Sequence, residues 1–363
     1  MPIRLLAAIV LAAAASLLAG RPAEAIPVFA HRYGLTCQAC HTTVPHLTEL
    51  GEAFLAGGYR LPARTPGAAF PLAVKVNLAY GSEAEASLPK AVVDEVELLT
   101  GGSIGKRGAY FAEQYVVDGG RPGQARDLWA SWRVTPDGAR THALLRGGQF
   151  GLELPLDPET FRETTDHYAI WDQTAGENPF RFFTPKIGLS ARIGSDGHGV
   201  SGTFAALQAR DPGSGLAPHG VDRYLMLQQA RGNVVLSAYR YDGTRAIAGG
   251  DDRFWRQGYG AGFELGRARL DAVYQHGFDT RAGAGAPLRS SGGFVQLRYE
   301  VSQRAFAIAR YDATQDTAFA RALVAGAGFR VARNARLTVF DTMRRAEDRA
   351  RTYSVSTGLM FAY

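Results

Sequence analysis

Ala73-Val74-Lys75-Val76-Asn77-Leu78-Ala79-Tyr80 alternates between apolar and polar side chains along its length. One face carries Val74, Val76, Leu78 and Tyr80, and the other carries Lys75 and Asn77. Successive side chains of an extended chain point to opposite faces of a sheet. The stretch therefore predicts a β-strand with one apolar face and one polar face.

The same period-two pattern recurs from Pro71 to Tyr363, with turn-forming pairs such as Asp196-Gly197 between the segments. Residues 185–193, 294–301 and 353–363 are clear further cases. Counting such segments predicts about 16 strands. The fold class is therefore all-β.

An apolar face and a polar face fit two architectures. A soluble β-sandwich hides the apolar face inside, whereas a transmembrane antiparallel β-barrel turns it toward lipid and keeps a polar lumen. Segments of about nine to eleven residues can cross a bilayer when tilted, which favours the barrel. So do the aromatic side chains near strand ends, which would form girdles at the membrane surfaces: Tyr239, Tyr241, Tyr259, Tyr274, Tyr299 and Tyr311. The terminal aromatic Tyr363 resembles the insertion signal of bacterial outer-membrane barrels.

The N-terminus has the layout of an export signal. A charged start at Met1–Arg4 precedes an apolar run at Leu5–Leu18 and the small-x-small site Ala23-Glu24-Ala25. We expect residues 1–25 to be a signal peptide, with an uncleaved membrane anchor as the alternative. The net charge of +6 would suit nucleic acid binding, but an exported protein rarely meets nucleic acid, so that partner is not expected.

The motif Cys37-Gln38-Ala39-Cys40-His41 contains both cysteines of the chain. Cys-x-x-Cys-His is the attachment pattern of a c-type haem, with two thiols for one porphyrin and the histidine as an axial iron ligand. A zinc site would require further ligands, and a thioredoxin-like pair would require a βαβ context. We therefore predict one covalent haem c on Cys37, Cys40 and His41, with His41 bound to the iron.

A short helical pattern follows the motif. Val44, Leu47, Leu50 and Phe54 recur at spacings of three and four, Pro45 suits a first turn, and Gly57-Gly58 suits a helix end. The segment is too short to bury a core alone. Because it precedes the first strand, we expect it to fold back into the barrel lumen.

The sixth iron ligand has several candidates. His31 precedes the motif and could fold over the porphyrin, and Met360 falls by parity on the polar face of the last strand. Met226 shares that parity argument, and His46 lies close to the motif. Histidine would lower and methionine would raise the reduction potential. We take His31 or Met360 as the leading candidates, with an open or water-bound site as an alternative.

Residues 26–59 resemble the fused monohaem cytochrome c–porin family of bacterial outer-membrane iron oxidases. The resemblance rests on Ile26-Pro27-Val28-Phe29-Ala30-His31-Arg32-Tyr33-Gly34 before the haem motif and on Pro45–Phe54 and Gly58-Tyr59 after it. It implies a barrel of about 16 strands and an Fe(II) oxidase type of electron transfer. The implied partners are extracellular Fe(II) or another donor, a periplasmic cytochrome and outer-membrane lipid. No catalytic side chain is predicted.

The expected organisation is therefore a signal peptide (1–25), a monohaem cytochrome c segment (26–68) and an outer-membrane porin-like barrel (69–363). The haem would lie in the lumen or at its periplasmic mouth. Two other functions remain open: a transport porin with a structural or redox-sensing haem plug, and a soluble periplasmic cytochrome with a β-sandwich.

Residues 151–183 form the longest break in the alternation. They are rich in acidic and aromatic residues, namely Asp157, Glu159, Glu163, Asp166, His167, Asp172 and Glu177 beside Phe161, Tyr168 and Trp171. Carboxylates and imidazoles could attract Fe(II). Because their spacing shows no ligand periodicity, we favour a solvated or lumen-folded loop of a porin.

Overall fold

The computed structural model describes residues 27–41, 47–61, 67, 71–83, 90–136, 139–156, 163–164, 167–195, 199–209, 220–248, 250–332, 334–347 and 351–362. The helices are α2 (Pro27–Tyr33), α3 (Cys37–Cys40), α4 (Glu49–Ala56) and α6 (Ala169–Asp172). The first strands are β1 (Ala73–Glu83), β2 (Lys90–Ile104), β3 (Gly108–Asp118), β4 (Arg121–Pro122), β5 (Ala125–Arg133), β6 (His142–Phe150), β7 (Lys186–Gly194), β8 (Gly199–Gln208) and β9 (Val221–Arg231). The remaining strands are β10 (Val234–Ile247), β11 (Gly250–Leu265), β12 (Ala268–Gly283), β13 (Ala286–Ser302), β14 (Ala305–Gln315), β15 (Phe319–Ala332), β16 (Ala335–Ala346) and β17 (Thr352–Ala362).

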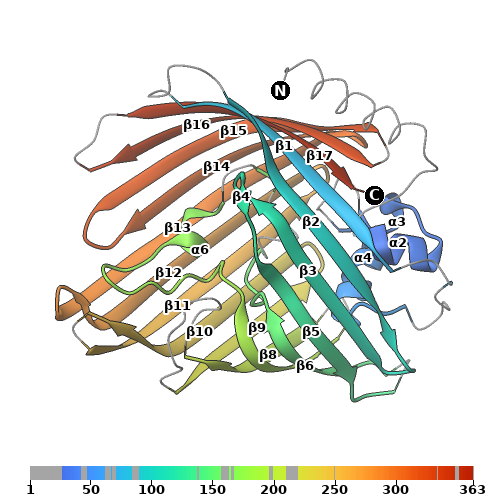
Figure 1. Cartoon of the computed structure of the whole chain (residues 1–363), viewed down its shortest axis with the longest axis horizontal. Helices are drawn as coiled ribbons and strands as arrows, with labels where there is room; N and C mark the ends of the chain where they lie inside the picture. The colour runs from blue at the N-terminus through green and yellow to red at the C-terminus, as the bar shows by residue number, and fades with distance from the viewer. Residues whose placement is uncertain are drawn as a thin grey trace.

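The strands form one closed antiparallel barrel (Figure 1). Each long strand pairs with its neighbour in sequence, and β1 pairs with both β2 and β17, which closes the ring. The two-residue strand β4 pairs with β3 alone. Leaving β4 aside, the described part of the chain contributes 16 strands to the ring, and the predicted strand number is confirmed.

Alternate side chains of each strand point to the outer and the inner face of the closed ring. On β13, Val295 and Leu297 are each 48% exposed on the outer surface, whereas Gln296 between them is 2% exposed. On β7, Leu189 is 69% exposed and Lys186 is fully buried. The apolar faces point outward and the charged faces point into the barrel, which is the arrangement of a barrel in lipid. The β-sandwich alternative is therefore wrong.

The tyrosines near strand ends divide between the two faces. Tyr259, Tyr274, Tyr299 and Tyr311 lie on the outer surface, as expected of girdle residues. Tyr239 and Tyr241 of β10 are buried inside the barrel, where their hydroxyls donate to Gln275 and Asp222. The girdle interpretation is wrong for these two, because strand parity and not nearness to a strand end decides which face a side chain takes.

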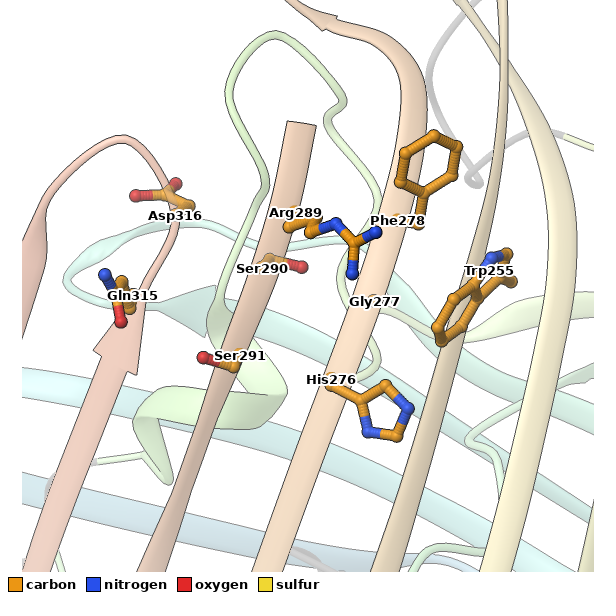
Figure 2. A pocket seen from close by; sticks show the side chains of 9 residues that line it. All are labelled: Trp255, His276, Gly277, Phe278, Arg289, Ser290, Ser291, Gln315 and Asp316. Atoms are coloured by element: carbon orange, nitrogen blue, oxygen red, sulfur yellow. The ribbon is translucent and has the colours of Figure 1, made fainter. Parts of the chain in front are cut away.

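The outer surface becomes polar toward one end of the barrel. Figure 2 shows this region, with Trp255 on β11 and with His276 and Phe278 on the same face of β12. Below we call the end where β1 begins and β17 finishes the terminal end, and the other the opposite end. Trp255 and His276 lie in the half of their strands nearer the opposite end.

The apolar core lies inside the barrel. One cluster of buried side chains joins α2 and α4 to inner-face residues of the strands and to the connection 151–185, and it includes Phe29, Trp129, Leu152 and Trp171. No helix within the described residues is both long and apolar enough to cross a bilayer. The core cluster shows that α2, α4 and described residues of the connection 151–185 lie inside the lumen.

Candidate functional site

The haem motif forms a compact turn at the terminal end of the barrel (Figure 1). Cys37 and Cys40 are the first and last residues of α3, so one helical turn separates them. Thr48 holds this turn in place, because its hydroxyl donates to the Ala39 carbonyl at 2.7 Å and its N–H donates to the Cys40 carbonyl at 2.9 Å. The same hydroxyl caps α4 by accepting from the Gly51 N–H at 3.3 Å.

Helix α4 begins later than the sequence pattern suggested. Leu47 forms an isolated bridge with His41, and Thr48 has extended backbone angles, so the helix starts at Glu49. Val44, Pro45 and His46 lie outside the described residues. The predicted end is confirmed, since Gly57 caps the helix and its N–H donates to the Ala53 carbonyl.

A glycine allows α3 and α4 to approach each other. A Cβ on Gly51 would lie 2.2 Å from the Cys40 carbonyl oxygen, so no larger residue fits there without a backbone shift. Cys40 is half-buried, and burial raises the pKa of its thiol. The packing therefore fixes the backbone around the motif.

The helical segment packs on the inner wall of the barrel. The Phe29 ring of α2 lies 5.0 Å from the Phe54 ring of α4 and 6.2 Å from Phe111 of β3. Gly101 of β2 makes room for it, because a Cβ there would lie 2.5 Å from the Phe29 ring. Tyr59, just after α4, lies 5.0 Å from Trp129 of β5. These rings anchor residues 27–61 to β2, β3 and β5.

The residues present fit a covalently attached haem. Two cysteines one helical turn apart and an adjacent histidine are the donor set that such a group requires. His41, the last residue of the motif, is half-buried. Across the described residues, no group of three or more His, Cys, Asp or Glu side chains is arranged to hold a metal ion. A single axial histidine on a porphyrin does not require such a group.

The candidates for the sixth iron ligand lie at different places. Met360 and Met226 are buried on the inner faces of β17 and β9, as their parity predicted. His31 belongs to α2, but its side chain lies outside the described part of the structure. The structure thus places Met360 in the lumen and leaves the choice between Met360 and His31 as a prediction.

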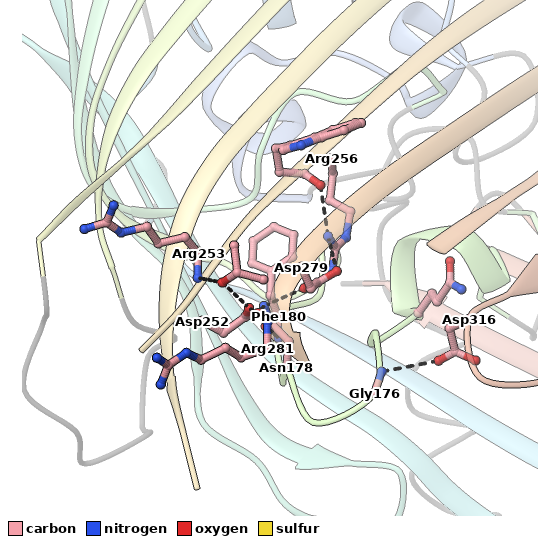
Figure 3. A network of polar contacts seen from close by, with 12 residues as sticks. Gly176, Asn178, Phe180, Asp252, Arg253, Arg256, Asp279, Arg281 and Asp316 are labelled. Atoms are coloured by element: carbon pink, nitrogen blue, oxygen red, sulfur yellow. Dashed lines mark hydrogen bonds and ion pairs between the residues drawn. The ribbon is translucent and has the colours of Figure 1, made fainter. Parts of the chain in front are cut away.

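The described residues of the long connection 151–185 lie in the lumen and are held to the wall by a polar network (Figure 3). The Asn178 side-chain amide donates to Asp252 of β11 at 2.8 Å and to Asp279 of β12 at 3.0 Å. Arg256 donates to Asp279 at 3.0 Å, and the Arg281 N–H donates to Asp252 at 2.8 Å. The Asn178 side-chain amide group thus donates twice to the wall, and the side-chain carbonyl accepts from the Phe180 N–H within its own turn.

Acidic residues earlier in this connection lie next to basic side chains. Glu163 accepts from Arg298 of β13 at 2.6 Å, and both side chains are almost fully buried. Asp172 lies 3.1 Å from His167 and 3.6 Å from Arg181. These carboxylates support the lumen-folded interpretation, while Asp157, Glu159, Asp166 and Phe161 lie outside the described residues.

One set of contacts links the connection to the helical segment. The Arg146 guanidinium lies over the Trp129 ring at 4.9 Å and ion-pairs with Glu153 at 3.5 Å. Burial alone would raise the pKa of Glu153, but Arg192, Arg146 and a hydrogen bond from Thr203 together lower it. Glu153 therefore stays ionised, and it joins the start of the connection to β6, β7 and β8 through Arg146, Arg192 and Thr203.

The sequence interpretation allowed for arginines in the lumen but did not single out which ones face inward. Arg146, Arg245, Arg256, Arg298 and Arg310 all face inward, and each lies against a buried carboxylate or an aromatic ring. The signal that could have found them is parity, because each occupies the polar face of its strand. Parity also accounts for the partner of Arg310, because Asp312 lies two residues further along the same strand. It does not reveal the partners that come from other strands or from the long connection, such as Asp222 for Arg245 and Glu163 for Arg298.

Comparison with solved structures supports the barrel alone. An anion-selective porin from Comamonas acidovorans superposes with a TM-score of 0.63 at 13% identity, over 80% of this chain and 98% of that chain. Salmonella typhi OmpF, solved in complex with Daunomycin, gives a TM-score of 0.58 at 12% identity over 80% and 97%. Vibrio cholerae OmpT gives 0.56 at 7% identity over 80% and 97%.

No protein-family model and no curated protein sequence matches the chain. At these identities the structural likeness shows the fold and nothing of the activity. The fold is that of a porin-type β-barrel of 16 strands.

Proposed function

We propose that this chain is a porin-type barrel of the bacterial outer membrane whose lumen serves as a passage for small solutes or electrons. The observation that carries the proposal is the sorting of the two faces, seen most clearly on β13. Its outward side chains from Val295 to Val301 are apolar and about half exposed, while Gln296 and Arg298 point inward and are buried. Exposed apolar surface of this extent is stable in lipid and unstable in water.

The passage is narrowed from two sides. The described residues of the segment 27–61 contact the inner faces of β2, β3 and β5, and the described residues of the connection 151–185 contact those of β8 to β14. Barrels of this size otherwise enclose a wide aqueous channel. A narrowed lumen favours small solutes over large ones.

Conductance in a planar bilayer tests the passage. We expect the wild-type protein to form small, discrete channels, and Asn178→Leu to enlarge them because the connection loses its bonds to Asp252 and Asp279. Asn77→Leu is the matched control, since Asn77 lies on β1 and its amide donates to Asp94 instead. A wild-type protein that forms no channel, or equal conductance in the two variants, would contradict the proposal.

We further propose that the barrel carries one haem c on Cys37, Cys40 and His41, close to the inner wall. What supports this is the motif itself and the packing of its segment on β2, β3 and β5. The two thiols would hold the porphyrin and the His41 imidazole would bind its iron, with His31 or Met360 as the second axial ligand. A bound haem supplies a one-electron redox couple.

Electron transfer is the second candidate function, with extracellular Fe(II) as the donor and a periplasmic cytochrome as the acceptor. The apolar band of an outer-membrane barrel is about 25 Å tall, so a redox group held on the inner wall shortens the distance that an electron must cross. The wall of strands separates the two compartments, and the lumen-facing charges keep the passage hydrated. An Fe(II) oxidase type of reaction follows from the family resemblance and is proposed on that basis.

Absorption spectroscopy of the purified protein separates the two functions. We expect a Soret band that persists after denaturation and is lost in Cys40→Ala. Mixing with Fe(II) should reduce the haem iron and so shift the band. Removal of the sixth ligand converts a low-spin spectrum to a high-spin one, so Met360→Leu and His31→Leu are compared in parallel. If Fe(II) does not reduce the haem, the protein is a transport porin with a haem plug. If the protein is colourless and its thiols are free, it carries no haem.

A further inference from the structure

A groove lies on the outer surface of the barrel over β10 to β15. It consists of two adjoining hollows of about 520 Å³ and 760 Å³, which share Ser291 and Gln315. Both volumes are in the range of ligand-binding pockets. Because the hollows share part of their lining, they form one continuous groove.

The floor of the larger hollow is made of small side chains that face outward side by side. Ala261 pairs with Ala272 across β11 and β12, and Gly293 pairs with Ala313 across β13 and β14. Larger outward side chains flank this floor, among them Tyr259, Tyr274 and Tyr311. The groove therefore results from residue size along four neighbouring strands, and its lining is apolar.

The smaller hollow is more polar than the larger one and lies nearer the opposite end (Figure 2). Arg289 and His276 line it together with Trp255, and the His276 ring meets the Trp255 ring edge-on at 5.3 Å. Among the residues that the structure describes, no carboxylate pairs with Arg289. The acidic residue of the lining, Asp316, accepts instead from the N–H groups of Gly176 and Ala318.

The groove crosses the boundary between apolar and polar outer surface. Along β13 the outward residues are apolar from Val301 to Val295 and become polar at Ser291 and Arg289. Along β12, His276 stands about 13 Å beyond Ala272 at the usual rise of an extended chain. A bilayer places its acyl chains and its headgroups at two such levels, in the same order.

We propose that this groove binds one lipid with an anionic headgroup, from the leaflet at the opposite end of the barrel. Arg289 and His276 receive the phosphate, Ser291 and Gln315 donate hydrogen bonds to it, and an acyl chain lies over Ala272, Gly293 and Ala313. Lipid recognition of this kind combines a basic headgroup site with an apolar surface. A second copy of the chain fits less well, because the centres of protein interfaces are depleted of charged residues and Arg289 would have to be buried.

The proposal depends on the barrel lying in a membrane but not on the haem. It is tested by native mass spectrometry of the full-length protein in detergent, titrated with dimyristoyl phosphatidylglycerol and, separately, with phosphatidylcholine of the same chains. We expect one tight adduct with phosphatidylglycerol. Arg289→Gln should weaken it about fivefold, the loss expected for one cation at a lipid surface.

Two matched controls isolate the groove. Arg253→Gln removes an exposed arginine of β11 outside the lining, and it should leave the adduct unchanged. Ala313→Leu fills the apolar floor and should abolish the adduct, whereas Ala309→Leu, on the same face of β14 but outside the groove, should not.

Three results would overturn the proposal. They are equal binding of the two lipids, equal loss in Arg289→Gln and Arg253→Gln, and a wild-type oligomer that Ala313→Leu dissociates. The last result would assign the groove to a second copy of the chain. Each of them leaves the barrel and its haem as proposed, since the folded state is checked separately by its gel mobility before and after heating.

Discussion

At the scale of single residues, buried ion pairs decide how the long connection is held. Glu163 and Arg298 are almost fully buried and lie 2.6 Å apart, and Arg298 also donates to Glu300. Removal of one member of a buried pair leaves an uncompensated charge, which costs more than removal of both. The pair therefore acts as a fastening between the connection and β13.

We predict that Arg298→Met lowers the free energy of unfolding by about 3–5 kcal/mol, the usual cost of breaking a buried pair from one side. Urea unfolding, followed by the change in gel mobility, measures it. The double variant Glu163→Gln with Arg298→Met should recover part of the loss. If the losses of the two single variants simply add in the double variant, the two side chains do not interact.

Among the secondary-structure elements, parity explains which face each strand side chain takes. It does not explain the path of the connections between strands. The alternation in 294–301 predicted an outward Val295 and an inward Arg298, and both are confirmed. Period two states which side chains share a face, but it does not state which face meets lipid until the ring is closed. The girdle interpretation of Tyr239 and Tyr241 was wrong because it relied on their nearness to a strand end, whereas parity places both side chains on the inner face of β10.

The lipid-facing surface can be tested on one strand. We predict that Leu297→Arg, in the middle of the outward face of β13, lowers the free energy of unfolding by about 2–4 kcal/mol, because a charge at mid-bilayer is desolvated. Val301→Arg, on the same face near the terminal end, should cost at most about 1 kcal/mol. Equilibrium unfolding in lipid vesicles compares the two, and equal costs would argue against a bilayer around this face.

The path of residues 151–185 could not be predicted from sequence. Its fixed points are single contacts of Asn178, Glu163 and Tyr168 with strands that lie more than 70 residues further along the chain. No local pattern encodes such pairings. The haem motif is the opposite case, because five consecutive residues carry both thiols and the adjacent histidine.

At the scale of the whole molecule, two inward-folded segments share one apolar core. Residues 27–61 reach it through Tyr59 and Trp129, and Arg146 extends the contact toward Glu153 and the connection. The sixteen-stranded ring therefore has a partly filled lumen. The position of the helical segment on the inner wall follows from these contacts and not from the family resemblance.

We predict that Trp129→Ala releases the helical segment, because Trp129 is 5% exposed and carries the Tyr59 ring. Trypsin should then cleave after Arg60, which is buried in the intact protein. Trp132→Ala is the control, since Trp132 lies three residues away on the outer face and is 50% exposed. Resistance to trypsin in both variants would show that other contacts hold the segment.

We propose that one polypeptide combines a closed membrane barrel with a covalent haem. A single gel of the membrane fraction, run before and after heating and stained for haem, tests both parts of this proposal at once. We expect one haem-stained band that changes mobility on heating, because the folded barrel resists detergent until it is heated while the thioether-linked haem stays on the chain. A band whose mobility does not change on heating, or one that changes without staining for haem, would contradict it.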